Sequence, residues 1–240
     1  MSAYDLTLLI HIVLFCYWLG GDVGVFYSSK FVVDPSLQRE TRLIATKIMM
    51  GCDLIPKICM TMMLTVGGIL SEFHGITHPT WQMVGIVLLG PFWVSIVLLL
   101  HFKHNASYIP LLTKFDFYLR WLIVIGLIVS TSYSWMTGRL ADDPWMAGKL
   151  IVFAGLVFCG LMIRVGLKDF GASYGKIIAD KVTDEDNQKM IASLDRVRPW
   201  VYTIWIGLLI EATLGIVQPG SPDSLGYVPA TETIEQHVSR

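Results

Sequence analysis

The sequence predicts an all-α, polytopic integral membrane protein, a bundle of about six transmembrane helices with both termini in the periplasm. Its composition is the first indication, because 54% of the 240 residues are hydrophobic and only 15% are charged. A water-soluble domain of this size has a different balance. The second indication is a series of apolar stretches of about 20 residues, the length that crosses about 30 Å of hydrocarbon as a helix. The third is that none of them alternates like a barrel strand, so helices must satisfy the backbone in lipid.

Six stretches have the required length, namely residues 4–28, 43–71, 82–102, 116–137, 145–167 and 198–217. The first has neither a basic flank before it nor a small-residue cleavage site after it, so it is predicted to be an uncleaved span. Residues 168–197 are the sizeable soluble stretch. There, the letters TDED from Thr183 resemble a capping box and precede apolar residues at helical spacing, which predicts a short amphipathic helix on the cytoplasmic surface. Residues 1–217 therefore form the transmembrane domain, and residues 218–240 a flexible periplasmic tail.

The distribution of basic residues predicts the orientation. They concentrate in the connections after the first, third and fifth spans, and the opposite side holds only Arg139, Lys149 and the terminal Arg240. By the positive-inside rule both termini face away from the cytoplasm, which predicts a multi-pass protein of the bacterial inner membrane. Because the basic residues are spread over three loops beside the membrane, they indicate no nucleic-acid partner.

Two charges interrupt the second span. Asp53 and Lys57 lie four residues apart in GCDLIPKICMTMMLTVGG, so they can pair on one helix face, and Pro56 between them is expected to kink the helix. Ionisable groups in spans tend to face the bundle interior, a cavity or a pathway. A functional polar pocket and a structural ion pair are both compatible with this pattern.

The same span is rich in sulfur. Cys52, Cys59 and Met63 share one helical face, and thiolate and thioether ligands suit Cu(I). Packing is the favoured interpretation, because no second helix offers a matching methionine cluster and both residue types are adaptable apolar fillers.

His11 is the histidine that lies well inside a span, about 10 Å below the outer surface at the usual helical rise. Trp18 follows seven residues later, and then Gly20 and Gly24 at a spacing that permits close helix approach. This stretch resembles the first helix of HemJ-type protoporphyrinogen oxidases and of the related CopD-like membrane proteins. WMAGKL, which begins at Trp145, is similar to the WMHAKL of the HemJ family, and the last span is placed like that family's final helix.

The resemblance covers the first, fourth, fifth and sixth spans, which makes the second and third an addition to a four-helix haem-binding core. It implies that His11 and Lys149 belong to a haem b or porphyrin site, which also includes Trp18. A neutral imidazole can ligate haem iron, and Arg139 and Lys149 are the basic residues available for the propionates. Ala147 stands where the family has a histidine, which favours haem binding over porphyrinogen oxidation.

The second axial ligand is open. Candidates at a depth comparable to that of His11 are Glu211 in the sixth span and Met60, Met62 and Met63 in the second. His74 and His78 can reach the iron only if the second helix extends outward.

Three functions follow from these observations. The expected one is a haem-b redox protein that passes electrons to the quinone pool or anchors a dehydrogenase complex in the membrane. Its partners are then lipid, quinone and a redox protein, in a homo- or hetero-oligomer. The alternatives are a HemJ-like protoporphyrinogen oxidase and a CopD-like copper transport protein that uses the sulfur-rich face of the second span. No catalytic residue is assigned.

Overall fold

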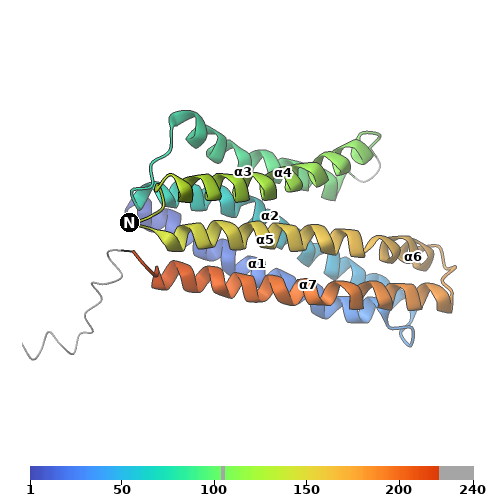
Figure 1. Cartoon of the computed structure of the whole chain (residues 1–240). Coiled ribbons are helices and arrows are strands. Elements are labelled where there is room, and N and C mark those ends of the chain that lie inside the picture. The colour runs from blue at the N-terminus through green and yellow to red at the C-terminus, as the bar shows by residue number, and fades with distance from the viewer. Residues whose placement is uncertain (104–105, 222–240) are drawn as a thin grey trace, which may run out of the picture.

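The computed structural model describes residues 1–103 and 106–221, which form seven α-helices and no strand. The helices are α1 (Ala3–Val33), α2 (Arg39–Phe73), α3 (Thr80–Phe102), α4 (Ile109–Met136), α5 (Pro144–Gly166), α6 (Lys168–Ile178) and α7 (Asp184–Val217) (Figure 1). The all-α class is therefore confirmed.

Five of these helices are long and apolar enough to cross a membrane: α1, α2, α3, α5 and α7. This agrees with a helical membrane bundle. Helix α4 coincides with the fourth predicted span but is not one of the five, so length and composition alone do not establish six crossings.

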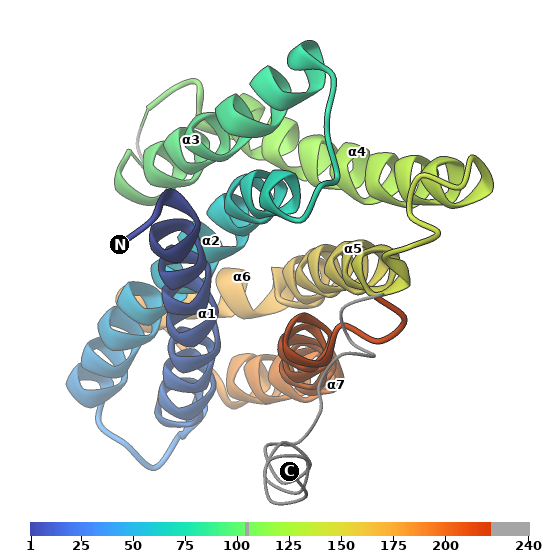
Figure 2. The ribbon, with the colours of Figure 1, turned by 90° about the vertical axis from the view of Figure 1, so that its left-hand side faces the viewer.

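The long helices pack as neighbouring antiparallel pairs. Helix α1 has its most extensive contact with α2, and α5 with α7, while α3 packs on α2 and α4 on α5. Figure 2 views the bundle from the end where α1 begins, with α3 and α4 together on one side of the other long helices. The sequence predicted α2 and α3 as an addition to the core, whereas here α2 is the main partner of α1. The start of α1 and the end of α7 lie at the same end of the bundle (Figure 1).

Glycines bring α1 and α2 into close contact, although not at the predicted pair of positions. A Cβ added at Gly21 would lie 2.6 Å from Cδ of Pro56, and one at Gly24 would lie 3.0 Å from Sγ of Cys52. A Cβ at Gly20 would meet no atom within 4 Å. Gly24 contacts α2 as expected. The second glycine at the contact is Gly21 and not Gly20, because Gly21 lies on the face of α1 that is turned toward α2.

The predicted capping box is present at the start of α7. The Asp186 amide donates to Oγ1 of Thr183 at 3.3 Å, and the Thr183 amide donates to the Asp186 carboxylate at 3.1 Å. The predicted separate amphipathic helix after the box is wrong, because α7 continues through Pro199 to Val217 without a break. The surface helix in this region is α6 instead.

Two arginines connect helices at the end of the bundle opposite the start of α1 and the end of α7, and we call this end the basic end. Arg42 is buried and donates to the Val32 carbonyl at 2.8 Å and to Oδ1 of Asn187 at 2.9 Å. Arg39 donates to the carbonyls of Ile177 and Ile178, which terminate α6 and have no partner within the helix. Helices α1, α2, α6 and α7 are thereby joined. Of the predicted tail, residues 222–240 lie outside the described residues.

Candidate functional site

Three ionisable side chains from three helices come together in the half of the bundle that holds the start of α1 and the end of α7. They are His11 of α1, Lys149 of α5 and Glu211 of α7, and we call them the outer cluster. The Lys149 ammonium lies within electrostatic range of both His11 and Glu211. It also lies against the backbone of α7, because a Cβ added at Gly215 would be 3.0 Å from its Nζ.

The outer cluster is incomplete in its hydrogen bonding. Nδ1 of His11 and Oε1 of Glu211 are buried, and neither has a hydrogen-bond partner in the part of the chain that the structure describes. Buried polar atoms in folded proteins nearly always have a partner. Two such atoms beside an ammonium group therefore form a polar site that a bound group can complete.

The His11 ring also contacts α2. A Cβ added at Gly67 would lie 3.4 Å from Cε1 of His11, so Gly67 leaves room for the ring. Met63 precedes Gly67 by one helical turn and shares its face, and its side chain is buried in the core. Met62 points elsewhere, because its Sδ would be 3.1 Å from a Cβ at Gly90 of α3. The third candidate methionine, Met60, accepts from Nη1 of Arg120 at 3.7 Å and lines a different cavity, so Met63 is the candidate ligand on the His11 side of α2.

Aromatic rings line the outer edge of the outer cluster. Nζ of Lys149 lies 5.9 Å from the ring centroid of Trp145, which contacts His74 edge to face at 5.5 Å. Helix α2 therefore extends outward far enough to bring His74 near Lys149. His74 follows Gly67 by seven residues, or about 10 Å of helical rise, so it is displaced along the axis from His11. His78 contacts Glu72 instead, with 2.8 Å between Nδ1 and Oε1.

Two other predicted site residues lie away from the outer cluster. Arg139 is exposed and donates to the Thr77 carbonyl in the loop between α2 and α3. Trp18 is buried and contacts Phe153 edge to face at 6.1 Å. Trp18 lines a larger cavity in the other half of the bundle.

A cavity of about 470 Å³ lies toward the basic end, between the second half of α1, the first half of α2 and the facing parts of α3, α4, α5, α6 and α7. We call it the inner cavity. Asp53 and Lys57 form the predicted ion pair and line this cavity, although 41% of the Asp53 side chain and 44% of the Lys57 side chain remain exposed. His11 does not line it. Asp22 of α1 does, and its Oδ2 is buried without a partner among the described residues.

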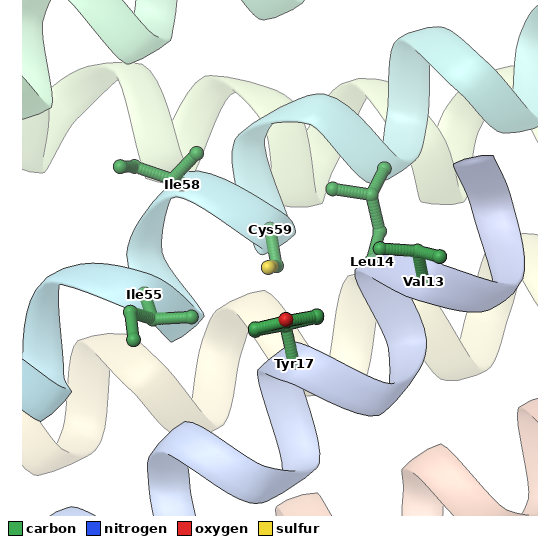
Figure 3. Close-up of a pocket in the computed structure, with 6 residues that line it drawn as sticks. All are labelled: Val13, Leu14, Tyr17, Ile55, Ile58 and Cys59. Carbon is green, nitrogen blue, oxygen red and sulfur yellow. The ribbon is translucent and has the colours of Figure 1, made fainter.

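A smaller groove of about 170 Å³ lies between α1 and α2 and has an apolar lining. Figure 3 shows Cys59 pointing toward Tyr17 across it, flanked by isoleucine, leucine and valine side chains. Cys52 packs against Gly24 instead. Across residues 1–103 and 106–221, no group of three or more His, Cys, Asp or Glu side chains is arranged to hold a metal ion. The positions of both cysteines agree with a packing role.

Sequence reasoning missed several charged residues of the inner cavity. Asp22 has no oppositely charged residue three or four positions away, so nothing in the local pattern marked it. Asp116 and Arg120 do have that spacing, but their third member, Arg164, comes from a different helix.

The chain was compared with protein-family models, with curated proteins and with solved structures, and none of these matches it.

Proposed function

We propose that this protein binds haem b at His11 in the bacterial inner membrane and passes electrons within the membrane. The electrons would go to the quinone pool or to a dehydrogenase complex that the protein anchors. The observation that carries this proposal is the outer cluster, in which His11 has an unpartnered buried nitrogen and lies within electrostatic range of the Lys149 ammonium. The resemblance of the His11 and WMAGKL stretches to HemJ-type proteins implies the same two residues, His11 and Lys149, for the haem site.

The side chains of the outer cluster suit a haem in three ways. The His11 imidazole can supply an axial nitrogen ligand, which is the usual ligand for b-type haem. The Lys149 ammonium can neutralise a propionate through a charge-assisted hydrogen bond. Met63 is the methionine on the side of α2 that contacts His11, so it is the best of the three candidate methionine ligands. When bound, haem supplies one-electron chemistry, and the buried setting of His11 shields it from bulk water.

The orientation of the bundle in the membrane is also part of this proposal. The basic residues of the α1–α2 connection and of α6 lie at the end opposite the termini, so the positive-inside rule places that end in the cytoplasm. The outer cluster is then on the periplasmic side.

Porphyrinogen oxidation is the weaker alternative at this site. Ala147, which stands at the family's histidine position, is buried with Ile76 and Leu140 in a small apolar cluster. That position therefore offers no titratable group for proton transfer. We expect that the gene will not complement a porphyrinogen-oxidase-deficient strain, and complementation would favour the enzyme over the electron carrier.

A visible spectrum of the purified protein tests haem binding. The wild-type protein is expected to show a Soret band, and a reduced α band after addition of dithionite. Lys149→Met should keep the bands but shift the midpoint potential, because it removes a positive charge near the haem. A colourless wild-type protein from haem-replete cells would overturn the proposal.

A further inference from the structure

The inner cavity has the properties of a ligand site that is separate from the outer cluster. Its volume of about 470 Å³ lies in the range of pockets that bind small molecules. Most of its lining is apolar, with Val25, Leu54, Leu156, Ile163 and Val201 among the contributing side chains. In Figure 2, α1 and α2 lie on one side of the bundle interior and α5 and α7 on the other.

One wall of the inner cavity carries two guanidinium groups that share a single carboxylate. Oδ2 of Asp116 accepts from Nε of Arg120 at 3.0 Å and from Nη1 of Arg164 at 2.6 Å. Oδ1 of the same carboxylate accepts from the Trp93 indole at 2.9 Å. Asp116 is 1% exposed, so protein donors rather than water satisfy it. Two cations and one anion leave this wall with a surplus positive charge.

The other charged groups of the inner cavity do not compensate this surplus by direct pairing. Lys57 pairs with Asp53, and Arg198 pairs with Asp195 at 2.6 Å. Asp22 and His101 also line the cavity. No ion pair within 4.0 Å joins Arg120 or Arg164 to a carboxylate other than that of Asp116 in the described residues. A surplus charge inside a membrane protein is costly and is typical of a binding site or a pathway.

We propose that the inner cavity binds an anionic amphiphile with one carboxylate or phosphate head group and a hydrocarbon tail. The head group pairs with Arg120 and Arg164, since guanidinium groups form paired hydrogen bonds with planar carboxylate and with phosphate. The tail lies along the apolar lining. This proposal does not depend on haem, because Arg120 and Arg164 belong to the half of the bundle away from His11.

Equilibrium binding to the full chain in phosphatidylcholine nanodiscs tests the ligand class. Radiolabelled dodecanoate and dodecyl phosphate are expected to bind saturably, and dodecanol, which has the same tail without the charge, at least about tenfold more weakly. If phosphatidylglycerol competes with dodecanoate, the anionic head group comes from a phospholipid. If it does not compete, the natural ligand is a free single-chain anion. Equal binding of dodecanol and dodecanoate would overturn the proposal.

Two substitutions test the location, each with a matched control. Arg164→Gln should weaken dodecanoate binding about tenfold, whereas Arg196→Gln, an exposed arginine at the same end, should not change it. Gly160 lines the inner cavity, and a Cβ there would meet no atom within 4 Å, so Gly160→Leu extends a side chain from an open position on the cavity wall. Gly155→Leu is its control, because Gly155 is equally open, lies on the same helix and does not line the cavity.

Gly160→Leu keeps the test valid if Arg164→Gln does not fold. Loss of dodecanoate binding in Gly160→Leu with retention in Gly155→Leu would support the inner cavity as the site. Full binding in Gly160→Leu would place the amphiphile elsewhere and overturn the proposal.

Discussion

At the scale of single residues, Asp116 is the group on which most buried polar contacts converge. Its carboxylate joins Trp93 of α3, Arg120 of α4 and Arg164 of α5, so one side chain links three helices. Removing one member of a buried ion pair leaves the partner charge without compensation, and this usually costs far more than the pair contributes to stability.

We therefore expect Asp116→Asn to lower the free energy of unfolding by about 3–5 kcal/mol, because two guanidinium groups lose the carboxylate that they share. The measurement is the unfolding transition in detergent followed by circular dichroism. Asp195→Asn is the control, since the Asp195–Arg198 pair is exposed, and it should cost at most about 1 kcal/mol. Equal effects of the two substitutions would contradict the role given to Asp116.

At the scale of helices, the closest contact between α1 and α2 is at Gly21. Gly21 faces the ring of Pro56, and its neighbour Gly20 faces open space. Pro56 lacks an amide hydrogen and loosens α2 at this point, and the same ring fills the position opposite Gly21. The two helices are thus in closest contact next to Asp22 and the Asp53–Lys57 pair.

Gly21→Ala should destabilise the protein by about 1–3 kcal/mol, because the new methyl group overlaps Pro56 and forces the helices apart. Gly20→Ala is expected to be neutral or slightly stabilising, because alanine favours the helix and meets no neighbour. The comparison needs only the thermal midpoints of the two variants. A larger effect at Gly20 would show that α1 is rotated differently about its axis.

The helices could be predicted where local chemistry decides the structure. The TDED letters predicted the cap at Thr183 correctly, because a capping box involves only residues within one turn. The continuity of α7 through Pro199 was missed, since the sequence does not show that neighbouring helices hold the segment before the proline. The choice of Gly21 over Gly20 depends on the rotation of α1, which contacts with α2 determine.

The sequence predicted how deep the residues of the outer cluster lie in the membrane. It did not predict that they lie near one another. Charge counting placed His11 and Lys149 near the same membrane face, and Glu211 was expected at a similar depth. Only the structure shows that α1, α5 and α7 bring Lys149 within electrostatic range of both His11 and Glu211. Arg139 was expected beside them from its charge and side, but the loop that carries it is fixed to Thr77 instead.

At the scale of the whole molecule, charge and packing divide the bundle into two halves. The start of α1 and the end of α7 lie at one end with the outer cluster, while the basic loops and the inner cavity lie toward the other. In the proposed orientation the outer cluster is near the periplasm and the inner cavity near the cytoplasm.

Reporter fusions test this orientation. Alkaline phosphatase fused after Gly220 is expected to be active, because the enzyme folds only in the periplasm, and the same reporter fused after Lys181 should be inactive. Green fluorescent protein should give the opposite pattern at the two sites. An active phosphatase after Lys181 would show that the basic end faces the periplasm.

Haem content per polypeptide is the most direct test of the proposed function. We expect the pyridine haemochrome assay to find haem b in the wild-type protein and in His78→Ala, since His78 contacts Glu72 outside the outer cluster. His11→Ala should lose most of the haem while it remains folded, as judged by its circular dichroism. Equal haem content in His11→Ala and His78→Ala, or no haem in any of the three proteins, would contradict the assignment of His11 as the haem ligand.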